Sequence, residues 1–147
     1  MAVKKGATKP DISTPDALKK TLLSAKSVGY SDSASGVYIS TTMFKILGIE
    51  KEMAAKAHKI ENGPVGETVA AGVNEIGFQH LSELKRVPGI DIVGPLPDKV
   101  QLVTVFSAGI PTNAKSPEVA KALIAFLSSP AAYAVIEANG LTPASKK

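Results

Sequence analysis

Apolar and polar positions along this chain alternate between short strand-like runs and longer stretches with helical spacing. Runs of four to nine apolar or alternating residues predict strands, and apolar residues three and four positions apart predict the helices between them. The expected strands are an edge strand around Val3, Ser27–Tyr30, His58–Glu61, Ile76–Gln79, Ile90–Val93 and the long Leu102–Ile110. The expected helices are residues 15–25, Val37–Leu47, Glu50–Ala57, Val65–Gly72, a turn at His80–Leu84, and two near the C-terminus, 117–127 and 130–138. This order predicts an α/β fold with a mostly parallel sheet flanked by helices and joined by right-handed crossovers.

Two helix starts share a three-part signal. Thr14 and Ser116 each precede a proline and then an acidic residue. A hydroxyl at the cap, proline at the first helical position and a carboxylate in the first turn all favour helix initiation. We expect both hydroxyls to lie at helix N-termini.

A hydroxyl-rich loop separates the strand at Ser27–Tyr30 from the next helix. It contains Ser31, Ser33, Ser35 and Gly36, and the glycine is expected to let the backbone come close to a ligand. The first turn of a helix has unpaired N–H groups and a partial positive charge, so hydroxyls placed there favour a small anionic or polar ligand. One of these serines capping the helix is the alternative interpretation.

Two other predicted strands also end in polar loops, Glu61–Gly66 and Gln79–Glu83. Parallel strands present their carboxyl ends at one edge of a sheet, where ligands of α/β proteins bind. The three loops are therefore expected to converge on one cleft. His80 either faces that ligand or fills a turn.

Composition narrows the possible functions. With 147 residues, 44% apolar and 20% charged, the chain fits one globular domain. The net charge of +4 is scattered over lysines and a single arginine, Arg86, and aromatics make up only 5%, which argues against nucleic-acid binding. No apolar run is long enough to span a membrane, and the first residues contain no apolar signal core, so the polypeptide as written is expected to be cytoplasmic and not membrane-embedded.

Catalytic and metal motifs are missing from the sequence. There is no cysteine, and two histidines do not build a histidine-rich metal site. Cofactor fingerprints of the GxGxxG and GxxxxGK[ST] type are absent, as is GxSxG. Ser82 lies near His80 but without a third orienting group. We therefore expect no cofactor, no metal and no enzymatic activity, with a small α/β enzyme kept as an alternative.

Four segments carry a resemblance to a known family. Asp32–Tyr38, Glu75–Glu83, Lys115–Ala132 and Asn139–Pro143 resemble the type II periplasmic solute-binding proteins of ABC transporters, especially the molybdate-binding group. The resemblance implies a first hinge strand and linker at 1–11, an α/β solute-binding second lobe at 12–101, and a second hinge strand with the C-terminal helices of the first lobe at 102–147. The first half of lobe 1 would be lacking.

The same resemblance implies which residues bind the ligand. Ser35, Val65 and His80 would contribute the second lobe's part of the site, and His80 stands where relatives carry a tyrosine. The implied function is a solute-binding component, or a fragment of one, of an ABC importer, which in full length would bind its permease in the periplasm or outside the cell. A ligand-sensing domain of a transcription regulator is a further alternative.

The C-terminal helices also predict self-association. In the family interpretation their apolar faces cover a lobe that this chain lacks, so we expect a homo-oligomer that buries them. The residues concerned are Val119, Leu123, Ile124, Phe126, Leu127, Val135 and Ile136.

Overall fold

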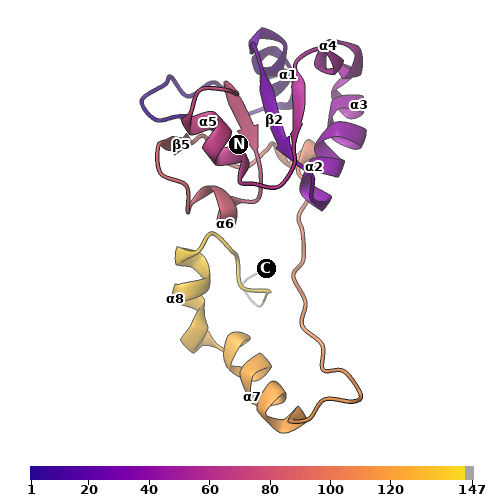
Figure 1. Cartoon of the computed structure of the whole chain (residues 1–147), viewed down its shortest axis with the longest axis vertical. Helices are drawn as coiled ribbons and strands as arrows, with labels where there is room; N and C mark the ends of the chain where they lie inside the picture. The colour runs from indigo at the N-terminus through magenta and orange to yellow at the C-terminus, as the bar shows by residue number, and fades with distance from the viewer. Residues whose placement is uncertain (145–147) are drawn as a thin grey trace. The chain divides into compact units, whose positions relative to one another are not determined.

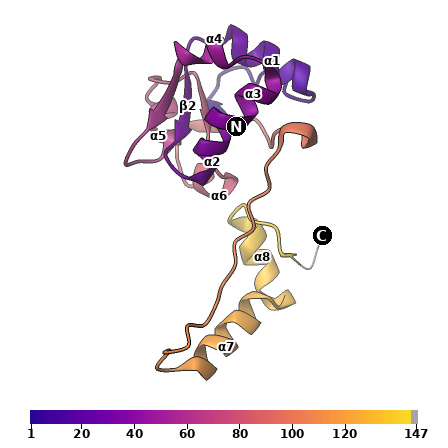
Figure 2. The same cartoon turned by 90° about the vertical axis from the view of Figure 1, so that its right-hand side faces the viewer.

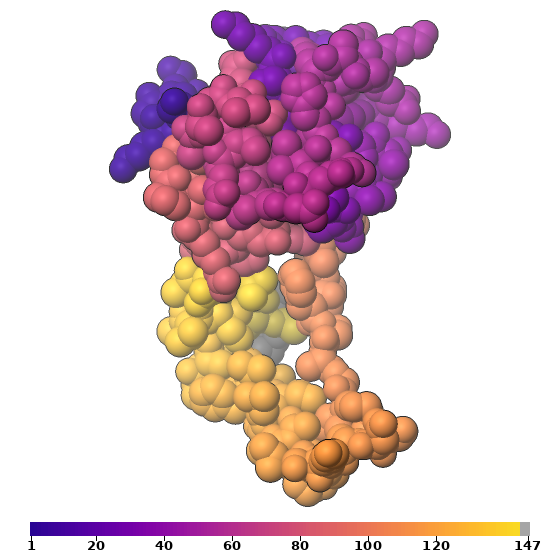
Figure 3. All heavy atoms as spheres, viewed as in Figure 1, coloured from indigo at the N-terminus to yellow at the C-terminus, as the bar shows by residue number. Residues whose placement is uncertain are grey.

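The computed structural model describes residues 1–144 and divides into two units. Unit 1 comprises Met1–Val103, and unit 2 begins at Thr104. Unit 1 contains the sheet and forms one closely packed body in the space-filling view (Figure 3). Unit 2 contains the last two helices.

Unit 1 is built on a five-stranded sheet. Its strands are β1 (Ala2–Lys4), β2 (Val28–Ser31), β3 (Ala57–Ile60), β4 (Ile76–Phe78) and β5 (Ile90–Ile92). Their order across the sheet is β3-β2-β4-β1-β5. The predicted α/β class and the positions of these strands are confirmed (Figure 1).

The sheet is mixed, so the prediction of a mostly parallel sheet is confirmed only in part. β2 pairs in parallel with β3 and β4, whereas β1 pairs antiparallel with β4 and β5, so β1 alone runs against the other four strands. The expectation that the strand around Val3 lies at an edge is wrong, because β1 lies between two partners. Ala2 and Val3 are 0% and 4% exposed, and a strand covered on both faces belongs inside a sheet.

Helices cover both faces of this sheet. One face packs against α1 (Pro15–Ser24), α2 (Ala34–Tyr38), α3 (Phe44–Leu47) and α4 (Glu50–Ala54) through one apolar cluster. That cluster contains Leu18, Leu22, Val28, Met43, Phe44, Ile49, Met53, Ile76 and Phe78 among others. The opposite face receives α5 (Val65–Ala70), and α6 (Leu81–Leu84) follows β4.

Two glycines make room for α5. Gly29 on β2 and Gly77 on β4 are register partners, so their bare backbones lie side by side. A Cβ at Gly77 would lie 2.6 Å from Val69 Cγ2 and 3.0 Å from Val65 Cγ1, both on α5. The glycine pair therefore lets α5 approach the sheet and brings its N-terminus to the edge where β2 and β4 end.

The predicted helix over 37–47 is confirmed and begins earlier, at Ala34. It runs through α2, a π-helical turn η1 (Ile39–Met43) and α3, and Gly48 ends it in the left-handed conformation at φ 61°. A π turn inserts one extra residue into a helix and often lies near a functional site. Tyr38 ties this helix to a short 3₁₀ turn η2 (Asp98–Val100), because its hydroxyl donates to the Val100 carbonyl at 2.8 Å.

The two predicted helix caps behave differently. Thr14 caps α1, since its Oγ1 accepts from the Ala17 N–H at 3.1 Å. Ser116 occupies the cap position of α7 (Pro117–Leu127), but its side chain makes no capping hydrogen bond. α8 (Pro130–Ala138) follows α7 directly, as predicted.

Leu102–Ile110 is not a strand, and that prediction is wrong. The segment is drawn as an extended trace without a strand arrow and is not part of the five-stranded sheet (Figure 2). Val103 and Val105 are 59% and 71% exposed, and so is Phe106 at 65%, so neither side of the alternating pattern is buried. A strand needs a neighbouring strand for its backbone hydrogen bonds, and alternation alone does not supply one.

Candidate functional site

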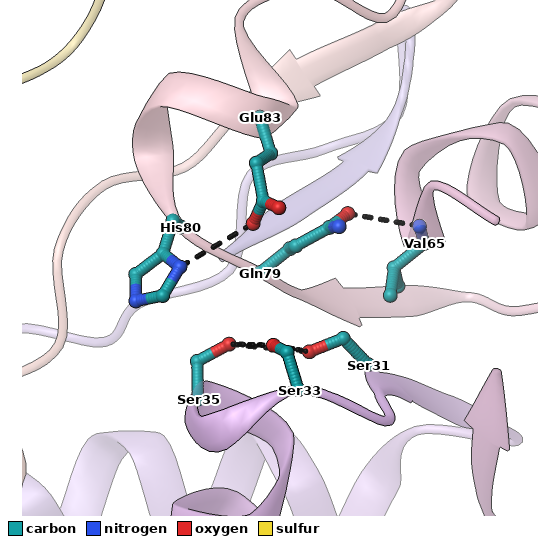
Figure 4. Close-up of polar contacts among 7 residues, drawn as sticks. All are labelled: Ser31, Ser33, Ser35, Val65, Gln79, His80 and Glu83. Atoms are coloured by element: carbon teal, nitrogen blue, oxygen red, sulfur yellow. Dashed lines mark hydrogen bonds and ion pairs between the residues drawn. The ribbon is translucent and has the colours of Figure 1, made fainter. Parts of the chain in front are cut away.

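Three polar loops lie at one edge of the sheet of unit 1. β2, β3 and β4 run in parallel, and Tyr30 is the register partner of both Lys59 and Phe78. The residues that follow these strands therefore emerge on the same side. Figure 4 shows Ser31, Ser33 and Ser35 on one side of this edge and Gln79, His80 and Glu83 on the other.

The three serines form a triangle of hydroxyl groups. Ser31 Oγ lies 2.8 Å from Ser33 Oγ and 3.1 Å from Ser35 Oγ, and Ser33 and Ser35 are 3.1 Å apart. Ser31 is only 2% exposed, whereas Ser33 is exposed and Ser35 half-buried. Each hydroxyl rotates freely, so donors that now satisfy one another can turn toward an anion.

Simple capping does not explain this loop. Ser33 occupies the N-cap position of α2, yet its side chain makes no capping hydrogen bond. The first N–H groups of the helix are thus not taken by that side chain, and they lie next to the hydroxyls along the chain. The loop presents hydroxyl and N–H donors together.

Gly36 has a role in packing that the sequence did not reveal. A Cβ at this position would lie 1.5 Å from the carbonyl oxygen of Ser31 and 2.5 Å from its carbonyl carbon. The helix therefore crosses the end of β2 so closely that only glycine fits. We expected Gly36 to let a ligand approach, but the close approach in the structure is between the helix and its own strand.

Val65 begins α5, and its backbone N–H already has a partner. It donates to Oε1 of Gln79 at 2.9 Å, a bond that joins the start of α5 to the end of β4. A ligand that takes the Val65 N–H would have to displace this amide. Sequence reasoning missed the role of Gln79, although a polar residue directly after a buried strand was a signal for it.

His80 follows Gln79 and pairs with the first turn of α6. Its Nδ1 lies 3.4 Å from Oε2 of Glu83, three residues later. Both side chains are partly exposed, at 24% and 45%. A carboxylate at one ring nitrogen orients an imidazole, and an imidazole is the side chain best suited to exchanging protons near neutral pH.

An ion pair lies at the end of β3, close to this edge. Lys59 near the end of β3 lies 2.8 Å from Glu61. Their hydrogen bond and mutual attraction raise the pKa of Lys59 and lower the pKa of Glu61. Among the described residues no group of three His, Asp or Glu side chains is arranged to hold a metal ion. Attraction for an anion would therefore come from hydroxyl and N–H donors rather than from a lone cation.

A separate hollow of about 350 Å³ lies at the start of α1. Asp11, Asp16 and Lys20 line it together with Thr14 and Thr21. Two carboxylates against one ammonium disfavour an anionic ligand in this hollow.

A profile of the bacterial extracellular solute-binding proteins matches residues 1–142. The chain belongs to that family. The predicted resemblance to a solute-binding protein family is thereby confirmed. No solved structure matches this chain.

A curated relative carries a different functional name. Over 143 residues the chain is 52% identical to a protein of Pseudomonas sp. named aconitate isomerase. The match covers 97% of this chain and 55% of the relative, so the chain spans about half the length of the curated relative it matches.

This relative overturns two expectations. The assignment to an ABC importer is wrong, and so is the expectation that the protein is not an enzyme, because a protein this similar over nearly the whole chain is named as an isomerase. The expectation failed because it relied on nucleophile motifs and cofactor fingerprints. An isomerase that only moves a proton needs neither; it needs one correctly placed acid–base group.

Proposed function

We propose that this chain is the substrate-binding portion of an aconitate isomerase, and that unit 1 corresponds to the second lobe of a type II solute-binding fold. The observation that carries the proposal is the 52% identity to the named isomerase over 97% of the chain. The proposed site is the edge at which Ser31, Ser33 and Ser35 face His80 (Figure 4).

The substrate class matches the donors at this edge. Aconitate is a propene that carries three carboxylates, and each carboxylate accepts several hydrogen bonds. The serine triangle and the N–H groups at the start of α2 supply donors for one of them. The net charge of +4 on the chain also favours the approach of a trianion.

The chemistry of the isomerisation asks for proton transfer. Removing a proton from the methylene carbon of aconitate leaves an allylic carbanion that the attached carboxylates stabilise. Returning a proton at the other end of the allyl unit breaks no other bond and allows the double bond to reform with the opposite geometry. One acid–base group therefore suffices, and no oxidant, reductant or second substrate is needed.

We assign this role to His80, with Glu83 positioning its ring. Glu83 holds Nδ1 at 3.4 Å, which directs the other edge of the imidazole away from α6. Ser31, Ser33, Ser35, Gly36 and Val65 would then form the remainder of the site, with Gly36 acting only through the packing that it permits.

A titration followed by NMR tests the binding part of this proposal. ¹⁵N-labelled chain is titrated with trans-aconitate, and shifts are expected at residues 31–36 and 79–83. The double variant S33A/S35A removes two donors to a charged group, each contributing about 1.5–3 kcal/mol, so binding should weaken at least about a hundredfold. The matched double variant S13A/S24A, at exposed serines shortly before α1 and at its last residue, should bind as the wild type does.

Two further measurements separate the alternatives. Molybdate, added as a competing oxyanion, shows whether the edge prefers a tetrahedral anion; molybdate binding there without aconitate binding would contradict the proposed substrate. Incubation with cis-aconitate in D₂O should place deuterium on the methylene carbon, and H80Q should abolish this exchange. Binding without exchange would limit this chain to holding the substrate and contradict the role of His80.

A further inference from the structure

The side-chain amide of Gln79 has one end fixed and the other end without a protein partner. Its Oε1 accepts the Val65 N–H at 2.9 Å. Only the oxygen of an amide can accept from an N–H group, so this contact assigns the orientation of the amide and places Nε2 at its other end. Among the described residues, 1–144, none accepts a hydrogen bond from Nε2. Both of its N–H donors are therefore available.

The only other glutamine in the sequence uses both ends of its amide. Oε1 of Gln101 accepts the Leu96 N–H at 2.8 Å, and its Nε2 donates to the Leu102 carbonyl at 2.6 Å. Both glutamines thus hold a backbone N–H with their oxygen, and they differ only at the nitrogen. Gln79 is half-buried, so its nitrogen depends on water or on a ligand for partners.

The register of the sheet places Gln79 beside the serine triangle. Tyr30 of β2 and Phe78 of β4 are register partners. The next residues along these two parallel strands are Ser31 and Gln79. Neighbouring strands lie about 4.8 Å apart, and side chains at equivalent positions project from the same face. That face receives α5, which begins at Val65, and Figure 4 shows the amide nitrogen of Gln79 on the side nearer the serines.

We propose that Gln79 is a ligand-binding residue whose Nε2 donates to an anionic oxygen of the substrate, a carboxylate oxygen in aconitate, while Oε1 stays on the Val65 N–H. The proposal rests on the function proposed above and adds a binding residue to the same site. The ligand is then held from two neighbouring strands, by the serine hydroxyls after β2 and by Gln79 after β4. Val65 contributes by orienting the amide.

The fixed amide nitrogen makes this edge selective for acceptors. A serine hydroxyl both donates and accepts, so the serine triangle alone does not distinguish a carboxylate from a neutral alcohol. Nε2 only donates, and the ligand group that faces it must accept. A carboxylate has two oxygens, so one can accept from Nε2 and the other from a serine hydroxyl.

Displacement of Gln79 from Val65 is the competing outcome. A ligand that took the Val65 N–H would exchange one hydrogen bond for another, and such exchanges contribute little net free energy. A ligand that accepts from Nε2 instead adds a hydrogen bond without breaking any within the protein. Retention of the bond between Gln79 and Val65 is therefore favoured.

Side-chain NMR signals of the wild type separate these two outcomes. The ¹⁵N-labelled chain is titrated with trans-aconitate, and the side-chain NH₂ signals of the two glutamines are followed. The signals of Gln79 should shift, whereas those of Gln101 should stay in place and the Val65 amide should move little. A large shift of the Val65 amide without one at the Gln79 nitrogen would overturn the proposal in favour of displacement.

Three variants test the donor itself. Q79E keeps an oxygen for the Val65 N–H but replaces the donor by an acceptor, so trans-aconitate should bind at least about tenfold more weakly while the midpoint of urea unfolding does not fall. Q79M adds no charge and should also weaken binding, with the backbone spectrum showing that it folds. Q101E adds the same charge at the other glutamine and should bind as the wild type does. If Q79M binds as tightly as the wild type, the effect of Q79E is repulsion alone and the proposal is wrong.

The same titrations distinguish a failure of this inference from a failure of the proposed function. Shifts at residues 31–36 with trans-aconitate but none at the Gln79 side chain would overturn the inference and retain the substrate. Shifts of the Gln79 side chain with molybdate but not with trans-aconitate would retain the donor and overturn the substrate. No shift with either anion would overturn both.

Discussion

Replacing Gly36 by alanine places two physical effects in direct opposition. Alanine is the better helix former by about 1 kcal/mol, and Gly36 lies within the helix that begins at Ala34. By propensity alone G36A should raise the free energy of unfolding. In the structure, however, the added Cβ would lie 1.5 Å from the carbonyl oxygen of Ser31, where an ordinary carbon–oxygen contact is about 3.3 Å.

The steric destabilisation should be much larger than the gain in helix propensity. Overpacking a core position costs about 1–3 kcal/mol when side chains can adjust. Here the obstacle is backbone at the end of β2, so the helix and the strand must separate by more than an ångström. We expect G36A to lower the free energy of unfolding by at least about 3 kcal/mol, a large part of the 5–15 kcal/mol typical of a domain.

Urea unfolding followed by circular dichroism measures this change. G63A is the control, because a Cβ at Gly63 meets nothing within 4 Å. It should leave the midpoint unchanged or raise the stability by up to about 1 kcal/mol, through the unfolded state. If G36A proves as stable as the wild type, helix propensity outweighs the contact with Ser31, and the close packing of the serine loop described above is incorrect.

Three further predictions concern stability. Burial lowers the pKa of the Met1 amine from 8.0 to about 6, so the unfolded chain binds more protons than the folded chain between these pH values. The free energy of unfolding should therefore rise by roughly 2–3 kcal/mol from pH 6 to pH 8. Urea unfolding of a variant with both histidines replaced by glutamine measures this change, and a flat pH profile would contradict it. T14A should lower the free energy of unfolding by about 1 kcal/mol because α1 loses its cap, whereas S116A should leave it almost unchanged in the same assay. Equal losses in the two variants would count against the capping assignment. Y38F should cost about 1 kcal/mol by leaving the Val100 carbonyl without its donor, and an unchanged unfolding midpoint would show that water replaces the hydroxyl.

Much of unit 1 was readable from local patterns. The cap, proline and acid at Thr14–Asp16 predicted the start of α1, and short apolar runs predicted β2 and β4. These signals are readable because each depends on residues within one turn or one strand. The serine loop at the end of β2 was also found in this way, since the strand, the hydroxyls and the following helix are contiguous in sequence.

Contacts between distant segments decided the rest. The place of β1 between β4 and β5 depends on residues more than 70 positions away, and Leu102–Ile110 has strand-like alternation but no place in the sheet. The fit of Gly36 against Ser31 and of Gln79 against Val65 likewise requires the folded backbone. Hydrophobic pattern specifies which face of an element is apolar, whereas the partner that covers that face is chosen only when the chain packs.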